Sequence, residues 1–268
     1  MDIIKYLVLG IIQGITEPLP ISSSGHIFLF KTIFNTNLFN SLNFEIISNF
    51  GSFLAIFFIF RKDILKILKD FFKFIFNKKL RNTCKVNFKY LIYIVISTIP
   101  VGITGLIFKD KISNYSIKFL GFAFLITALI LFLVRNIKGD KEDKDITLKN
   151  ALIIGLIEAI TIIPGISRSG TVLVACLLCN FKRDTALKYT FMLYFPVSIA
   201  TLFIGVPNLL NTTGLSLQIV PYLVGMISAT IVTYFSYKWL SKLVKNGKLI
   251  YFSFYCIFIA LFIFIYFR

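Results

Sequence analysis

Two short segments of the sequence combine glycine, proline and serine with ionisable side chains. The first runs from Glu17 to His26 (EPLPISSSGH) and the second from Pro164 to Gly170 (PGISRSG). Serine hydroxyls and the free N–H groups of a helix N-terminus bind anions, and a guanidinium binds phosphate through two parallel hydrogen bonds. These residue types therefore predict a phosphate-binding site that is built from both segments.

Arg168 is the strongest single candidate, because a guanidinium buried without an anion is costly. A structural ion pair with Glu17 or Glu158 is the alternative role for it. His26 is the only histidine of the chain, and its place in a serine-rich break points to acid–base or nucleophilic chemistry. Glu17 would repel an anion, so we expect it either to bind a divalent cation that bridges to phosphate, or to orient His26 or accept a proton from it.

The elements that position these segments are predicted to be membrane helices. Of the 268 residues, 57% are hydrophobic and only 15% are charged, which excludes an ordinary soluble domain. The net charge of +17 lies mostly in loops between apolar runs, so it indicates membrane orientation and not nucleic-acid binding. Six apolar runs are long enough to cross a bilayer; they cover about 42–60, 90–107, 117–135, 186–205, 219–238 and 250–267.

Two further apolar stretches, 3–15 and 149–163, are too short to cross, and each runs into one of the two Pro/Gly/Ser segments. We expect each to form a re-entrant helical hairpin with the short helix that follows. The two regions also repeat one another when Tyr6 is aligned with Ala151. In this register Gly10, Thr16, Ser22, Ser24 and Gly25 match Gly155, Thr161, Ser167, Ser169 and Gly170.

Basic residues predict the orientation of the chain. Residues 61–89 carry ten Lys or Arg, so this stretch is expected to be a cytoplasmic loop, and the loops near 35–41, 108–116 and 206–218 lie outside. Three crossings separate the hairpins, which therefore enter from opposite faces as an inverted repeat. We predict an all-α polytopic membrane protein with one membrane domain over 1–268, divided into repeats at about 1–135 and 149–268.

The remaining candidates are expected to line a cavity at the two breaks. Gln13 and Glu158 occupy equivalent positions of the repeats and should point into it. Glu45 either lines the entrance or lies at the membrane interface. The serines and glycines of the breaks are predicted to hold a diphosphate between two helix N-termini; they are Ser22, Ser23, Ser24, Gly25, Gly165, Ser167, Ser169 and Gly170.

At these residues the sequence resembles the undecaprenyl-diphosphate phosphatase family associated with bacitracin resistance. Residues 13–26 (QGITEPLPISSSGH) look like the family's (E/Q)xxxE element followed by its Ser-Ser-Gly-His segment, and residues 164–170 match its PGxSRSG motif. The resemblance implies a bacterial inner-membrane enzyme that hydrolyses undecaprenyl diphosphate to the monophosphate and so recycles the lipid carrier of cell-wall synthesis. It also implies a divalent cation, Mg²⁺ or Ca²⁺, and an active site open to the outer face.

The resemblance further implies an active site formed by Glu17, Ser23, His26, Ser167 and Arg168, with Gln13 at its edge. Two features depart from the family pattern. Thr171 stands one position earlier than the family's threonine, so a hydroxyl contact to phosphate is either lost or made by Thr171. Glu158 stands where the family usually has Gln, while many members carry Glu where this chain has Gln13. We hypothesise that the second carboxylate has moved across the pseudo-twofold axis into the same cavity.

Several alternatives stay open at this point. The nucleophile is either His26, through a phosphohistidine, or Ser23 with His26 as its base. The alternative function is a transporter or flippase for an anionic polyprenyl phosphate lipid, because inverted repeats with broken midplane helices are typical of transporters. The sequence does not fix the oligomeric state, and a homodimer is one option.

Overall fold

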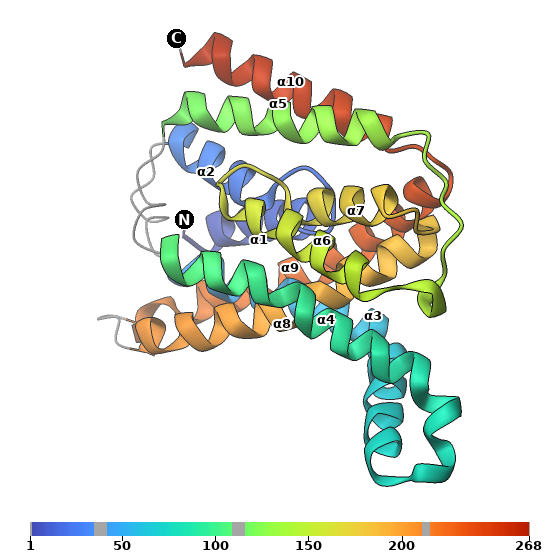
Figure 1. Cartoon of the computed structure of the whole chain (residues 1–268). Coiled ribbons are helices and arrows are strands. Elements are labelled where there is room, and N and C mark those ends of the chain that lie inside the picture. Colours follow the sequence, from blue (N-terminus) through green and yellow to red (C-terminus); the bar gives the residue numbers. More distant parts are fainter. Residues whose placement is uncertain (1, 35–41, 109–115, 211–214, 268) are drawn as a thin grey trace.

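The computed structural model describes residues 2–34, 42–108, 116–210 and 215–267. These ranges form ten α-helices and contain no β-strand, which confirms the predicted all-α class. The helices are α1 (Asp2–Thr16), α2 (Ser23–Phe34), α3 (Leu42–Phe76), α4 (Arg81–Phe108), α5 (Ile117–Val134), α6 (Leu148–Ala159), α7 (Arg168–Leu178), α8 (Arg183–Leu210), α9 (Leu215–Lys245) and α10 (Ile250–Tyr266). Figure 1 shows their arrangement.

Five segments of these helices are long and apolar enough to cross a membrane: Asn43–Phe76, Lys78–Phe108, Ile117–Val134, Arg183–Pro207 and Ile219–Lys245. Their outward faces carry large exposed hydrophobic side chains such as Phe58, Phe122 and Phe235, which suit contact with lipid. The chain is therefore a multi-pass membrane protein. The sixth predicted crossing is α10, which has 17 residues and lies alongside α5 (Figure 1); its role as a crossing stays a prediction.

The basic stretch 61–89 is helical, so its prediction as a loop was wrong. Helix α3 continues to Phe76 and α4 begins at Arg81, with a short 3₁₀ turn between them, and the pair projects from the bundle as a helical hairpin (Figure 1). Phe88 of α4 stacks on Phe71 and Phe74 of α3, with ring centroids 5.5 and 3.9 Å apart. Lysine and arginine have high helix propensity, so a helix can continue through a basic stretch. A cluster of positive charge therefore indicates where the chain leaves the membrane but not where the helix ends.

The loop predicted near 206–218 is also shorter than expected, because α8 reaches Leu210 and α9 begins at Leu215. Residues 35–41, 109–115 and 211–214, which belong to the three predicted outer loops, lie outside the described residues. The charged connections between α5 and α6, α7 and α8, and α9 and α10 lie together at one side of the bundle, opposite the C-terminal ends of α2, α4 and α8 (Figure 1).

Both predicted helix breaks are present. The first separates α1 from α2, and the second separates α6 from α7 with a 3₁₀ turn over Ile160–Ile162. The chain turns through left-handed backbone at Ser22 (φ 68°) and Gly165 (φ 89°). Ser22 and its repeat partner Ser167 then act as N-caps, because their hydroxyls accept the N–H of Gly25 (3.3 Å) and Gly170 (3.1 Å).

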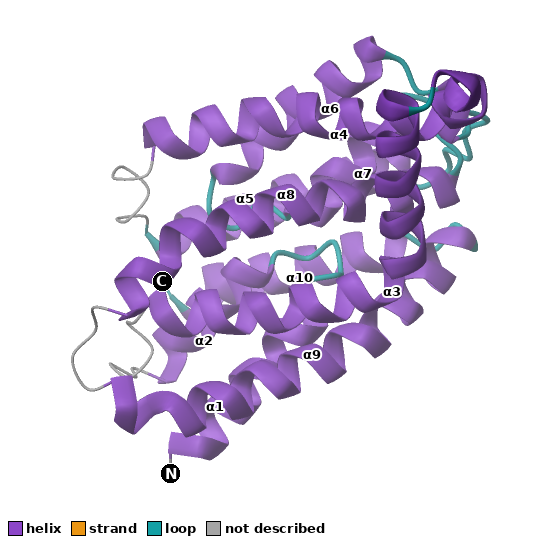
Figure 2. Ribbon diagram, turned by 90° about the horizontal axis from the view of Figure 1, so that it is seen from below, coloured by secondary structure: helices purple, strands orange, loops and turns teal. Residues whose placement is uncertain are grey.

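Each hairpin packs against a long helix of the other repeat (Figure 2). Helix α1 lies on α9, where a Cβ at Gly14 would meet the carbonyl oxygen of Ala229 at 2.8 Å. Helix α6 lies on α4, where a Cβ at Gly155 would clash with the backbone of Ser97. Small residues allow this close approach of helices in a membrane protein. The two repeats thus pack against each other through both hairpins. Helix α7, which is buried from Gly170 to Leu177, lies in the interior of the bundle.

Candidate active site

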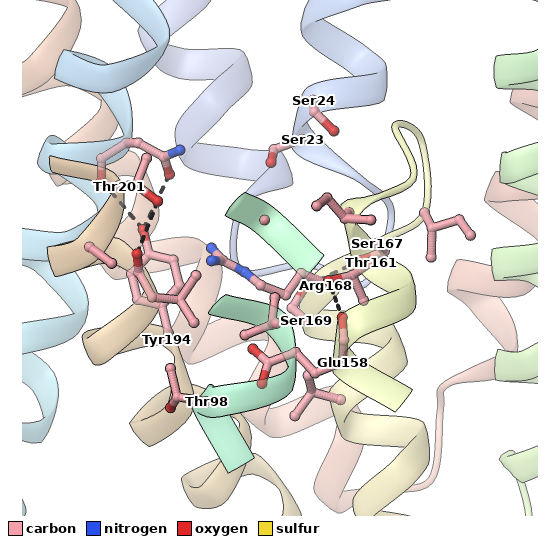
Figure 3. A pocket seen from close by; sticks show the side chains of 18 of the residues that line it. Ser23, Ser24, Thr98, Glu158, Thr161, Ser167, Arg168, Ser169, Tyr194 and Thr201 are labelled. Carbon is pink, nitrogen blue, oxygen red and sulfur yellow. Dashed lines mark hydrogen bonds between the residues drawn. The ribbon is translucent and has the colours of Figure 1, made fainter. Parts of the chain in front are cut away.

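The two breaks meet at a cavity of about 410 Å³. The two breaks are in direct contact, since the side-chain hydroxyl of Ser169 donates to the backbone carbonyl oxygen of Leu19 at 3.0 Å. Glu17 and Ser22 to Ser24 line the cavity from the first break, and Ser167 to Ser169 line it from the second. Residues of α3, α4, α6 and α8 complete the walls. Figure 3 shows Ser23, Glu158 and Arg168 around this space.

Glu17 is the centre of the polar cluster, and its side chain is only 8% exposed. Its Oε2 accepts hydrogen bonds from the Ser23 hydroxyl (2.6 Å) and from the Gln13 side-chain amide (2.9 Å). Its Oε1 accepts from the Arg168 guanidinium at 3.0 Å. The ion pair considered for Arg168 is therefore made with Glu17. Arg168 also lies over the ring of Tyr194, with 4.7 Å between the guanidinium carbon and the ring centroid.

The N-termini of α2 and α7 both begin at the cavity. The capping hydroxyls of Ser22 and Ser167 are engaged inside the protein, and these residues are only 3% and 1% exposed. The N–H groups of Gly25 and Gly170 are engaged as the donors to these caps. The first N–H groups of each helix have no intrahelical acceptor, so each terminus offers its partial positive charge to an anion in the cavity.

His26 faces away from this cluster. Its Nδ1 lies 2.7 Å from the Ser22 carbonyl oxygen and its Nε2 lies 2.7 Å from the Tyr255 hydroxyl. Because a carbonyl oxygen only accepts, the neutral ring carries its proton on Nδ1 and accepts from Tyr255 on Nε2. The ring also stacks on Tyr255, with centroids 5.6 Å apart. Within the described ranges, His26 is not one of the residues that line the cavity.

Five other predicted residues lie behind the cavity wall in the described part of the chain. Gln13 is 2% exposed and donates to Glu17 and to the side-chain oxygen of Asn49 (3.3 Å). Gly25 and Gly170 sit beneath the capping serines, and Gly165 packs against α5. Thr171 is 5% exposed, and its hydroxyl has no hydrogen-bond partner among the described residues.

Glu158 lines the cavity and is the most deeply buried of the acidic residues in its wall. It is 0% exposed, and neither carboxylate oxygen has a hydrogen-bond partner among the described residues. Its repeat partner Gln13 is by contrast fully engaged with Glu17 and Asn49. Glu45 lies elsewhere, because it pairs with Lys31 of α2 and is absent from the described cavity wall.

Sequence reasoning missed three polar residues that support this site. Asn49 of α3 accepts from Gln13 and from the Tyr194 hydroxyl (3.4 Å). Tyr194 of α8 underlies Arg168, and Tyr255 of α10 holds His26. All three lie in apolar helices, where an amide or phenol marks an internal hydrogen bond. An uncharged polar side chain within an otherwise apolar helix is the sequence signal that marks these three residues.

The residues present fit a divalent cation that arrives with a phosphate ligand. Within the described ranges, no group of three or more His, Cys, Asp or Glu could hold a metal ion by itself. Two carboxylates, Glu17 and Glu158, line the cavity together with serine hydroxyls. Mg²⁺ is commonly bound by one or two carboxylates plus the oxygens of a substrate phosphate. This donor set is therefore suited to a cation shared between protein and diphosphate.

The fold and the cavity define a class: multi-pass membrane proteins in which an arginine, two helix N-termini and several serine hydroxyls meet in one cavity at two helix breaks. The model of the family described as Bacitracin resistance protein BacA matches residues 6–262, and the chain belongs to this family. This confirms the family membership that the two motifs predicted.

Curated relatives match nearly the full chain. An undecaprenyl-diphosphatase 1 of Bacillus cereus is 42% identical over 96% of this chain and 95% of its own length. An undecaprenyl-diphosphatase of Oceanobacillus iheyensis is 41% identical over 98% of this chain and 96% of its own. An undecaprenyl-diphosphatase 1 of Halalkalibacterium halodurans is 37% identical over 95% and 92%. The similarity therefore includes both breaks and all the helices that position them.

Proposed function

We propose that this protein hydrolyses undecaprenyl diphosphate to undecaprenyl phosphate and inorganic phosphate. The observation that carries the proposal is the chain of contacts from Ser23 through Glu17 to Arg168, which joins a hydroxyl, a carboxylate and a guanidinium at the junction of two helix N-termini. The names of the similar curated proteins support the same substrate. A carrier that only moves an anionic lipid needs the positive charge but not the hydroxyl and carboxylate beside it.

The reaction begins with the terminal phosphate in the cavity. Arg168 and the N-termini of α2 and α7 neutralise its charge and orient it. The Ser23 oxygen attacks the terminal phosphorus while Glu17, 2.6 Å away, takes the hydroxyl proton. The bond from the terminal phosphorus to the bridging oxygen breaks, and undecaprenyl phosphate leaves. Glu17 gives that proton to the departing undecaprenyl phosphate and becomes a base again. Water then attacks the phosphoserine while Glu17 takes a proton from it, the bond from phosphorus to the Ser23 oxygen breaks, and Ser23 takes the proton from Glu17 as inorganic phosphate leaves.

Ser23 is preferred to His26 as nucleophile because of where the two side chains lie. Ser23 lines the cavity and contacts Glu17, whereas both nitrogens of His26 are engaged behind the wall. His26 is a positioning residue in this proposal, because it fixes the Ser22 carbonyl from which α2 starts. A divalent cation, Mg²⁺ or Ca²⁺, would be held by Glu17 and phosphate oxygens and would supply further charge neutralisation.

The proposed setting is the bacterial inner membrane, with α10 as a sixth crossing and the two hairpins re-entrant. The charged connections would face the cytoplasm, which places the C-terminal ends of α4 and α8, and the cavity mouth between them, on the outer side. Undecaprenyl diphosphate left by cell-wall synthesis would enter there and return to the carrier pool as the monophosphate. A homodimer is compatible with this arrangement, and no step of the reaction depends on one.

The test is phosphate release from undecaprenyl diphosphate by the purified protein in detergent, with and without EDTA. We expect release by the wild type and its loss in Arg168→Ala, because that change removes the charge that neutralises the phosphate. EDTA should abolish release, and added Mg²⁺ or Ca²⁺ should restore it. A folded wild-type protein that binds the lipid without releasing phosphate would instead indicate a transporter or flippase.

A further inference from the structure

The cavity has an apolar end that the hydrolysis of a phosphate does not use. Beyond the polar cluster it continues between α4 and α8, with residues at helical spacing on both walls. We call this part the α4–α8 groove; it is lined by Val101, Gly102, Gly105 and Leu106 of α4 and by Val197, Ala200 and Ile204 of α8. Thr98 and Tyr194 lie where the groove joins the polar end (Figure 3).

Two glycines of the groove have no packing reason to be glycine. A Cβ added at Gly102 or Gly105 would meet no atom of the described residues within 4 Å. At Gly14 and Gly155, by contrast, an added Cβ would collide with the backbone of a neighbouring helix. Glycine inside a helix costs about 0.5–1 kcal/mol relative to alanine. In the groove no close contact between helices offsets this cost. We infer that the two glycines keep the space beside α4 open.

The groove leads from the polar cluster to the lipid-facing surface. Leu106 and Ile204, at its far end, are 71% and 47% exposed although both are large and apolar. At its near end the cavity contains the unpartnered Glu158 carboxylate, a buried group that requires a donor or cation from outside the described residues. A ligand that carries a charged head with its cation and an apolar tail would satisfy both ends.

We propose that the α4–α8 groove binds the isoprene units of the substrate nearest the diphosphate, and that Gly102 and Gly105 determine acceptance of the prenyl tail. This inference rests on the proposed function. A cavity of about 410 Å³ is in the range of small-ligand sites, so it holds the head and the start of the tail. The rest of the tail leaves past Leu106 and Ile204 into the bilayer.

The kinetic test compares Gly105→Leu with Ile103→Phe, a control that adds bulk on the same helix at a residue that is 52% exposed and outside the cavity wall. Each is assayed on undecaprenyl, farnesyl and isopentenyl diphosphate. We expect Gly105→Leu to lower kcat/KM on the first two by about tenfold or more, mainly through KM, because lost tail binding is uniform binding. Isopentenyl diphosphate, which ends before the blocked part of the groove, should change by less than about twofold.

A labelling test does not depend on hydrolysis. Gly105→Cys and Ile103→Cys are reacted with a maleimide, with or without undecaprenyl phosphate; the native cysteines are all buried. We expect the lipid to protect position 105 at least about fivefold more than position 103. Equal protection, together with unchanged kinetics of Gly105→Leu on all three diphosphates, would overturn the groove inference. Protection of the Gly105→Cys thiol by the lipid, together with a wild type that hydrolyses none of the three diphosphates, would retain the groove and refute the proposed hydrolysis.

Discussion

Arg168 of α7 and Glu17 after α1 form an ion pair with 3.0 Å between the guanidinium nitrogen and Oε1, across 151 positions of the chain. The pair joins the second break to the first at the wall of the cavity. Removing one partner of a buried pair leaves an uncompensated charge, so this contact holds the repeats together as well as placing two charged groups for chemistry. In the proposed mechanism, structural and catalytic roles therefore coincide in these two residues.

Glu17→Gln should nearly abolish hydrolysis while the protein remains folded. The amide can still accept from Ser23, but it cannot take the hydroxyl proton or balance the charge of Arg168. We expect a loss of about 10²–10⁴-fold in kcat, as for other general bases. Glu45→Gln is the matched control, because Glu45 pairs with Lys31 outside the described cavity wall. Equal losses in the two variants, measured by phosphate release, would contradict the role given to Glu17.

His26→Gln and Tyr255→Phe should both have moderate effects, since each removes the 2.7 Å contact between the two side chains, and His26→Gln also removes the contact of Nδ1 with the Ser22 carbonyl. One neutral hydrogen bond is worth about 0.5–1.5 kcal/mol, so we expect each to lower kcat by roughly two- to tenfold. The check is kcat for both variants, with a base-stable, acid-labile phosphoryl group sought on quenched wild-type enzyme. Finding that group on His26 would make histidine the nucleophile and overturn the assignment to Ser23.

Substitutions at positions 158 and 13 test the hypothesis that the second carboxylate of the cavity is supplied by Glu158 of the second repeat and not by position 13 of the first. If Glu158 serves the cavity, Glu158→Gln should weaken the apparent affinity for Mg²⁺ on the order of tenfold, since cation affinity follows the number of carboxylates. Adding Gln13→Glu should restore the affinity for Mg²⁺, because the side-chain nitrogen of Gln13 lies 2.9 Å from Glu17 Oε2. The measurement is a Mg²⁺ titration of phosphate release after EDTA treatment. An unchanged titration in Glu158→Gln would refute the exchange.

Gly155→Leu should destabilise the protein, whereas Gly102→Ala should not. A side chain at Gly155 clashes with the backbone of Ser97, and overpacking typically costs about 1–3 kcal/mol. A Cβ at Gly102 meets open space, so alanine there should be neutral or stabilising by about 0.5–1 kcal/mol. Thermal unfolding in detergent compares them. A lower unfolding temperature in Gly102→Ala would mean that this glycine is a packing position.

Much of this architecture could be predicted from the sequence because hydrophobic length and Pro/Gly/Ser breaks act locally. The all-α class and both breaks were predicted, whereas an ion pair of Arg168 with Glu17 or Glu158 was only the alternative role expected for this arginine. The continuation of α3 through the basic stretch 61–89 was not, because charge patterning reports membrane position and not helix ends. The direction of His26 and the open space beside Gly105 depend on which helices pack nearby, and one sequence does not contain that information.

The most direct test of the central claim compares Ser23→Ala with Ser24→Ala in phosphate release from undecaprenyl diphosphate. Both serines line the cavity, and only Ser23 donates to Glu17. Ser23→Ala should lose activity on the order of 10³-fold or more, since the nucleophile is gone. Ser24→Ala should lose at most about tenfold, the value of one neutral hydrogen bond. Near-normal release by Ser23→Ala, or equal losses in both variants, would contradict a hydrolysis that proceeds through the Ser23, Glu17 and Arg168 cluster.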